Sequence, residues 1–270
     1  MLRQDLKRGL TSWQFWVGIS VFVAAMLLML RECLAGINIA TPMNAFDGIF
    51  FQNVVYILPI ISVLPLGTVF YDEWNSQNYR LFLPRCGWKQ YALKRIASTG
   101  ILGALIVGIP SALLIGFCYV VFPEDFSGAA NSIFKNLTIE NYPKYALWFP
   151  GGSVELMAAT PERLANAERI YAVARIASLL VFGACWAQIG LAVSAWIDNW
   201  VFILVVPLGV FMAGTFVGSW FYMPLVNTWS MATFGFGDYP LWVSYVIPLV
   251  WASIFIVFFV GGLRRRRAHE

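Results

Sequence analysis

The stretch Ala97–Phe122, ASTGILGALIVGIPSALLIGFCYVVF, contains no Asp, Glu, Lys or Arg. An apolar segment of about 20 residues is long enough to cross the roughly 30 Å hydrocarbon core of a bilayer as a helix. Because the backbone of such a segment must satisfy its own hydrogen bonds in lipid, we predict a transmembrane helix here.

Five further runs have the same length and lack charged side chains, so the sequence predicts six spans. The spans are Trp13–Leu30, Ile49–Tyr71, Ala97–Phe122, Ile176–Trp196, Trp200–Tyr222 and Leu241–Leu263. Of the 270 residues, 60% are apolar and 12% are charged, whereas soluble domains are about 45–50% apolar and about 25% charged. The composition excludes a soluble or disordered chain and predicts an all-α membrane protein with one transmembrane domain over residues 1–270.

Side chains suited to catalysis or metal binding are scarce. The only histidine is His269, which excludes most active sites and haem or metal sites built on histidine. The four cysteines lie in separate segments without CxxC spacing, at Cys33, Cys86, Cys118 and Cys185. There is no GxxxxGK[ST] phosphate loop. We therefore expect no catalytic residue, no metal site and no bound cofactor in this chain, which is not an enzyme by itself.

The basic residues divide unequally between the two sides of the predicted membrane domain. Twelve of the 18 Lys and Arg residues fall on the side that holds the termini, and six fall on the other side. The positive-inside rule then places both termini in the cytoplasm. We expect the run Arg264–Arg267 to anchor the last helix at anionic headgroups rather than to bind nucleic acid.

The N-terminal residues 1–12 have the pattern of a helix that lies in the membrane interface. Leu2, Leu6, Leu10 and Trp13 recur at helical spacing, and the charged side chains lie away from this stripe. Such a helix buries its apolar side at the headgroup boundary without crossing the membrane.

The longest segment between spans, residues 123–175, is predicted to be an extracytoplasmic loop. Near its end, Thr160-Pro161-Glu162 has an N-cap residue, a first-turn proline and a first-turn acid, a combination typical of a helix start. We expect a long helix to begin there and to continue into the fourth span. Arg175 should then extend its side chain to the outer interface.

Polar groups inside the predicted spans are few, and Asn53 and Gln188 are the best candidates to line a substrate path. No ionisable residue lies inside a span, which argues against a secondary transporter driven by protons or sodium. Prolines allow four of the spans to kink. They are Pro59, Pro65, Pro110, Pro207 and Pro248.

One motif suggests an intramembrane aspartyl protease. Gly235-Phe236-Gly237-Asp238 matches the GxGD pattern, and Tyr71-Asp72 supplies a second acid. Two such carboxylates must share a proton to act together. The predicted topology places Asp72 and Asp238 at opposite faces of the membrane, about 30 Å apart, which excludes this chemistry.

The cytoplasmic segment 72–96 carries the pattern that connects this chain to a known family. Span two ends in Phe70-Tyr71-Asp72-Glu73-Trp74, and Leu81-Phe82-Leu83, Arg85 and Lys94-Arg95 follow before span three. This pattern resembles that of the permease subunits of ABC-2 type transporters, although Gln77-Asn78 stands where the family has a Gly-Thr-like turn. The six spans, the amphipathic N-terminal helix and the cytoplasmic termini extend the resemblance over the whole chain.

The resemblance implies a dimer, homomeric or heteromeric, that docks cytosolic ABC ATPase subunits, which bind ATP and Mg²⁺. Residues 72–96 would contain a coupling helix that enters a groove on the ATPase. The contact residues would be Glu73, Tyr79, Arg80, Phe82, Leu83 and Arg85. The family usually exports its substrates, here an amphipathic or peptide-like molecule, and the chain would reside in the plasma (inner) membrane of a bacterium.

Two alternatives of other classes remain open at this point. The chain could be a non-transporting membrane assembly or sensor subunit, which would have no stoichiometric ATPase partner. A secondary transporter should show intramembrane charges or inverted repeats, and the sequence shows neither.

Overall fold

The computed structural model describes residues 2–36, 42–50, 54–65, 67–76, 87–122, 161–220 and 243–268. These ranges form helices and contain no strand. The helices are α1 (Leu2–Thr11), α2 (Trp13–Gly36), α3 (Pro42–Ile49), α4 (Val55–Val63), α5 (Gly67–Asn75), α7 (Trp88–Val121), α10 (Pro161–Ser194), α11 (Trp200–Trp220) and α13 (Val243–Ala268).

Five of these helices are long and apolar enough to cross a membrane, which confirms the predicted class of all-helical membrane protein. The candidate spans are Trp13–Arg31, Trp88–Val121, Glu168–Ser194, Trp200–Trp220 and Tyr245–Arg266. Each overlaps one of the six apolar runs of the sequence. Helix α10 begins at Pro161, as its start signal predicts, and α7 begins at Trp88, so its first turns lie inside the segment expected to be a loop.

The predicted second span, residues 49–71, is not one continuous helix. It is divided between the end of α3, α4 and α5, and residues 51–53 lie outside the described ranges. Helix α4 ends where the Leu64 N–H donates to Ile61 O, three residues back, at 3.3 Å. Pro65 follows, and it cannot donate the next bond of an α-helix. The helix predicted over residues 49–71 is therefore interrupted, and one break lies at a proline where the sequence allows a kink.

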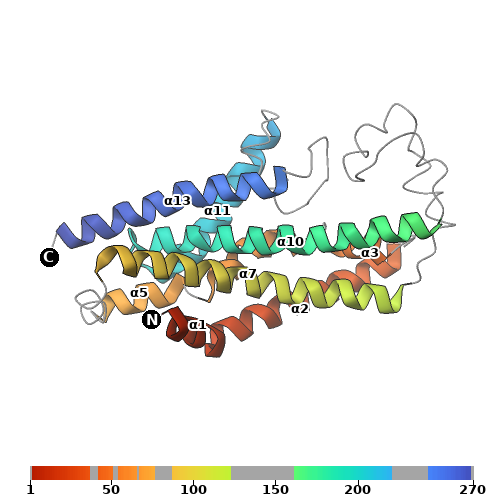
Figure 1. Ribbon diagram of the computed structural model, residues 1–270, viewed down its shortest axis with the longest axis horizontal. Coiled ribbons are helices and arrows are strands. Elements are labelled where there is room, and N and C mark those ends of the chain that lie inside the picture. The colour runs from red at the N-terminus through yellow and green to blue at the C-terminus, as the bar shows by residue number, and fades with distance from the viewer. Residues whose placement is uncertain are drawn as a thin grey trace.

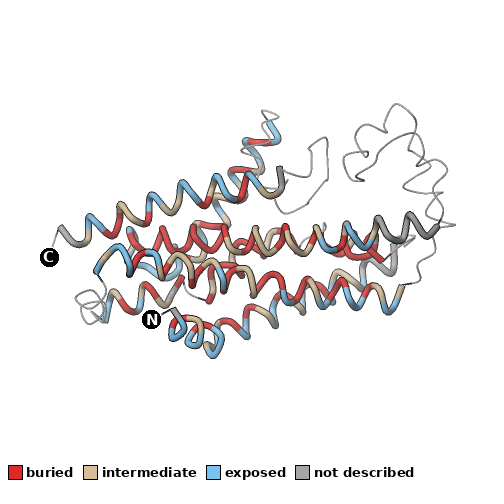
Figure 2. Tube along the Cα trace, in the orientation of Figure 1, coloured by how far each residue is buried: buried red, intermediate tan, exposed pale blue. Residues whose placement is uncertain are grey.

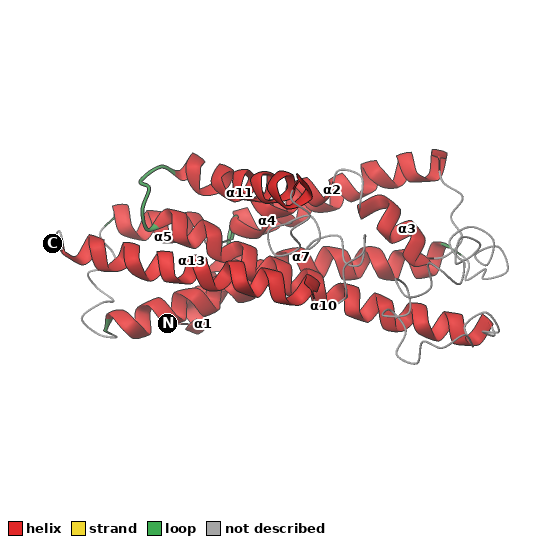
Figure 3. Ribbon diagram, turned by 90° about the horizontal axis from the view of Figure 1, so that it is seen from above, coloured by secondary structure: helices red, strands yellow, loops and turns green. Residues whose placement is uncertain are grey.

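Helix α10 is the centre of the bundle. It packs most extensively on α7 and next on α13, and Figure 2 shows it buried over much of its length. In the view from above, α10 and α7 run along one another (Figure 3). The ring of Phe182 stacks on that of Trp186 with centroids 5.1 Å apart, and Phe211 of α11 meets Trp186 edge-on at 5.7 Å. These aromatic rings fill the main hydrophobic core.

Two glycines allow the backbones of α7 and α10 to touch. A Cβ atom on Gly103 would lie 2.4 Å from Gly183 O, and one on Gly183 would lie 2.3 Å from Gly103 O. Small residues of this kind permit close helix packing in membranes. The contact fixes α7 and α10 as one closely packed pair.

One end of the bundle carries both termini, and we refer to it as the terminal end. Figure 1 places α1, the C-terminal end of α5, the N-terminal end of α7 and the C-terminal end of α13 there. A second, smaller hydrophobic cluster joins four helices at this end, with Phe70, Tyr91, Leu191 and Phe259 among its buried members.

Arg175, on α10, does not extend to the interface as the sequence predicts. Its side chain is completely buried, with Nε 3.4 Å from Oδ1 of Asp47. The guanidinium also lies over the rings of Phe46 and Phe50, and the Tyr171 hydroxyl donates to Asp47 at 2.7 Å. The prediction was wrong because α3 brings a carboxylate to Arg175 from a segment more than 100 residues away.

Helix α1 forms where the amphipathic pattern predicts, but it does not present all its polar residues to solvent. Asp5 is 4% exposed. A Cβ on Gly9 would lie 2.1 Å from the Leu102 side chain, so α1 packs closely on α7. Leu10 and Trp13 are exposed. A position of this helix in the membrane interface stays a prediction.

Candidate functional site

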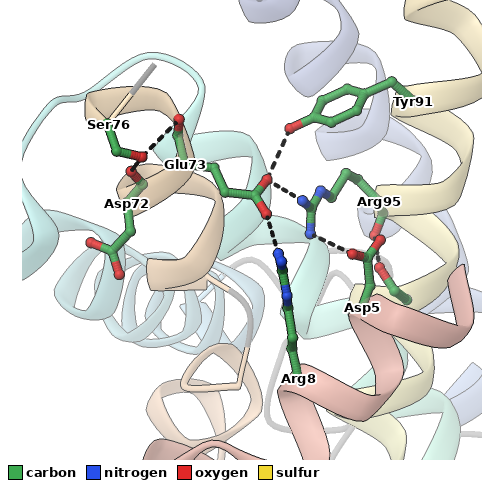
Figure 4. Close-up of polar contacts among 8 residues, drawn as sticks. Asp5, Arg8, Asp72, Glu73, Ser76, Tyr91 and Arg95 are labelled. Atoms are coloured by element: carbon green, nitrogen blue, oxygen red, sulfur yellow. Dashed lines mark hydrogen bonds and ion pairs between the residues drawn. The ribbon is translucent and has the colours of Figure 1, made fainter. Parts of the chain in front are cut away.

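Glu73 lies at the centre of a group of charged side chains at the terminal end, most of them buried (Figure 4). It is in the last turns of α5 and is 6% exposed. Its carboxylate forms an ion pair with Arg95 of α7. The Tyr91 hydroxyl donates to Glu73 Oε2 at 3.4 Å, and Arg8 Nη1 lies 3.4 Å from Oε1. Three helices therefore meet at one carboxylate.

Arg95 extends the group to a second acid. Its Nη1 lies 3.6 Å from Oδ1 of Asp5, and its side chain also lies over the Tyr91 ring, with Cζ 5.4 Å from the centroid. We call Asp5, Arg8, Glu73, Tyr91 and Arg95 the charge cluster.

Helical spacing explains how each element presents its residues. Tyr91 and Arg95 are four residues apart on α7, and Asp5 and Arg8 are three apart on α1, so each pair lies on one face of its helix. Glu73 projects from α5 toward both faces, as Figure 4 shows.

The charge cluster is balanced, with two carboxylates against two guanidinium groups. Removing charges from water is costly, and such a pair is stable only when its partners and hydrogen bonds are in place. Taking away one partner of a buried ion pair typically costs about 3–5 kcal/mol, since the other charge is left uncompensated. The charge cluster therefore holds α1, α5 and α7 in one relative position.

The position of the charge cluster relates it to the expected coupling segment. Residues 77–86 lie between α5 and α7 in the sequence, and the charge cluster joins the two helices that flank them. Asp72, the neighbour of Glu73, is exposed, and partial desolvation raises its pKa above the ordinary value. At the end of α5, the backbone carbonyl of Asp72 accepts hydrogen bonds from the Ser76 hydroxyl at 2.6 Å and from the Ser76 N–H at 2.9 Å.

Most residues predicted to contact a partner lie outside the described ranges. They are Tyr79, Arg80, Phe82, Leu83 and Arg85. Asn53 and Asp238 also lie outside them. Glu73, expected at the rim of a partner interface, has its carboxylate directed to α1 and α7 instead. A contact between Glu73 and a partner stays a prediction.

Gln188 is buried between α10 and α7. Its Nε2 donates to Ile96 O at 3.0 Å and to Ala184 O at 3.3 Å. Beside it, Gly100 leaves room for the side chain, because a Cβ there would lie 3.2 Å from Nε2. Gln188 therefore joins the two central helices, and its role in a substrate path stays a prediction.

Arg266, near the C-terminal end of α13, also makes contacts at the terminal end. The sequence did not predict these contacts. Arg266 donates from Nε to Ala195 O at 2.7 Å and from Nη2 to Ser194 O at 3.2 Å, and it forms an ion pair with Asp198. Its guanidinium lies 5.0 Å from the ring centroid of Trp74 on α5. Arg266 thus binds carbonyls at the end of α10, and the contact of the run Arg264–Arg267 with headgroups stays a prediction.

Arg95 and Asp5 were also missed as site residues. The sequence did contain a signal for each residue. Lys94-Arg95 ends the motif quoted above for residues 70–95, and Asp5 is an acid in an otherwise basic helix. Neither pattern reveals that the two side chains meet, because that contact depends on how α1 packs on α7.

No protein-family model, curated protein or solved structure matches this chain. Among the residues that the structure describes, no group of three or more His, Cys, Asp or Glu side chains could hold a metal ion.

Proposed function

We propose that this chain is the membrane-spanning permease subunit of an ABC transporter, driven by ATP that separate cytosolic ATPase subunits hydrolyse. The observation that carries the proposal is the charge cluster, which locks α1, α5 and α7 together on both flanks of residues 77–86. A buried charge cluster beside a connecting segment is suited to transmit a displacement, because it couples the segment to the helices on either side.

The proposal includes six crossings. Helices α3, α4 and α5 together supply the crossing between α2 and α7, although none of the three is long enough alone. An even number of crossings agrees with the position of α1 and the end of α13 at one end of the bundle (Figure 1). The excess of basic residues then assigns this end to the cytoplasm.

Coupling would begin at residues 77–86. A partner that binds Phe82, Leu83 and their neighbours moves the ends of α5 and α7. The charge cluster passes that movement to α1, and the backbone contact at Gly103 and Gly183 passes it from α7 to α10. Two such permease chains in a dimer would then rearrange around the substrate, which we propose is exported.

The experiment is affinity purification of the tagged chain from detergent-solubilised membranes of its own cells, with the bound proteins quantified by mass spectrometry. We expect an ABC ATPase in about 1:1 ratio. Replacing anchors at the core of an interface typically costs about 2 kcal/mol or more. The variant F82A/L83A should therefore lose at least about tenfold of the ATPase.

The matched control is L27A/L28A, which removes two leucines from an exposed face of α2. It should retain the ATPase. Absence of an ATPase from the wild-type preparation would contradict the permease assignment and favour an assembly or sensor subunit. Equal recovery with F82A/L83A would contradict the coupling role of those two residues.

A further inference from the structure

Two cationic side chains from different helices lie within 6 Å of the centroid of one indole ring at the terminal end. Lys89 Nζ lies 5.9 Å from the centroid of the Trp88 ring, and Arg264 Cζ lies 5.3 Å from the same centroid. Lys89 belongs to the first turn of α7, and Arg264 lies near the C-terminal end of α13. The ring therefore gathers two positive charges from two spans.

Neither cation has a carboxylate partner within the described part of the chain. This distinguishes them from Arg95, Arg175 and Arg266, each of which forms an ion pair. Lys89 and Arg264 are exposed. Two positive charges near one ring and without a described carboxylate partner attract an anion to this place.

The surroundings favour an amphipathic anion over a free one. Leu93 lies one helical turn from Lys89 on the same face of α7 and is 67% exposed. Arg265 lies over the ring of Trp196, and Trp200 is exposed close by in the sequence. Exposed tryptophans beside basic residues are typical of the headgroup layer of a membrane.

We propose that Lys89 and Arg264 form a binding site for the phosphate of an anionic phospholipid, with Leu93 against its acyl chain. Guanidinium and ammonium groups are strong donors to phosphate oxygens. Bound there, the lipid would bridge the start of α7 and the end of α13. The site does not depend on the proposed transport function.

The test is native mass spectrometry of the purified full-length chain titrated with phosphatidylglycerol, with phosphatidylcholine, and with inorganic phosphate as a competitor. Because two basic residues that each attract an anionic surface are removed, K89A/R264A should weaken phosphatidylglycerol binding by about 30-fold. Phosphatidylcholine should bind more weakly to the wild type, and inorganic phosphate should not displace the lipid.

The matched control is R3A/K7A, which removes two exposed charges from α1 at the same end. It should bind phosphatidylglycerol as the wild type does. Equal affinity of K89A/R264A and wild type would overturn the proposal, as would an equal loss in the control. Displacement by inorganic phosphate would show a site for free anions instead.

A measurement on the wild type alone covers the case in which the double variant does not fold. Hydrogen exchange in phosphatidylcholine nanodiscs, with and without phosphatidylglycerol, should show protection of residues 88–93 and 260–266 only when the anionic lipid is present. The same exchange in both lipids would overturn the proposal.

Discussion

Arg95 is the residue whose buried ion pairs join α7 to both α1 and α5 at the terminal end. Its side chain is 3% exposed and forms ion pairs with an acid on each of two other helices, whereas the Arg8 side chain is 60% exposed and, among the described residues, forms an ion pair with Glu73 alone. A buried guanidinium requires its carboxylates, because water does not compensate its charge. The ion pair of the exposed Arg8 should contribute little to the free energy of unfolding, since exposed ion pairs contribute about 0–1 kcal/mol.

The first prediction concerns the acid at the centre of the charge cluster. Glu73→Gln should lower the free energy of unfolding by about 3 kcal/mol, because it removes one partner of a buried ion pair. The double variant E73Q/R95M should lose less than the sum of the two single variants, since neither charge is then left alone. Thermal unfolding of the purified chain in detergent measures each value.

Asp72→Asn is the control for this prediction, because the adjacent Asp72 is exposed and forms no described ion pair. It should change the unfolding midpoint little. Equal destabilisation by D72N and E73Q, or strict additivity of E73Q and R95M, would contradict the role assigned to the buried pair.

At the residue scale, the sequence identified Glu73 but assigned its carboxylate to a partner. It also placed Arg175 at the interface, where the structure has it buried against Asp47. The contact of Glu73 with a partner stays a prediction, but the contacts that the structure gives both residues were missed for one reason. A charged residue at the end of an apolar run has no visible partner in the sequence, and only the packing of a distant helix supplies one.

At the element scale, the closest contact in the core joins α7 and α10 through backbone atoms. Gly183→Ala should destabilise the protein by about 1–3 kcal/mol, because the new methyl group would meet Gly103 O and force the helices apart. The thermal midpoint in detergent should fall accordingly.

Gly116→Ala is the matched control on α7, because a Cβ there has no neighbour within 4 Å. It should be neutral or slightly stabilising, as alanine favours a helix more than glycine does. Similar midpoints for G183A and G116A would show that the α7–α10 contact tolerates a side chain.

The elements themselves were largely predictable, because a long apolar run without charges can satisfy its backbone in lipid only as a helix. The sequence allowed a kink at Pro65, but it did not distinguish this proline, at which a helix ends, from the others. Four other prolines lie inside helices, at Pro59, Pro110, Pro207 and Pro248. Proline alone therefore does not decide whether a span is interrupted, and the packing around it must contribute.

At the scale of the whole molecule, the third prediction is the orientation. Reporters fused to the N-terminus and to the C-terminus should both be cytoplasmic, because 12 of the 18 basic residues lie on that side. Paired fusions of a fluorescent protein, active inside, and alkaline phosphatase, active outside, measure each end. Termini on opposite sides would mean that α3, α4 and α5 do not complete a crossing.

The interruption of the predicted second span lets its parts pack in different places. The buried apolar side chains of α4 belong to the main core, whereas the fully buried Phe70 of α5 belongs to the smaller cluster with α7, α10 and α13. Val69 and Tyr71 of α5 pack against the main core as well, so α5 bridges the two clusters. Glu73 further ties α5 to α1 and α7. A displacement of the end of α5 would therefore be felt in both clusters.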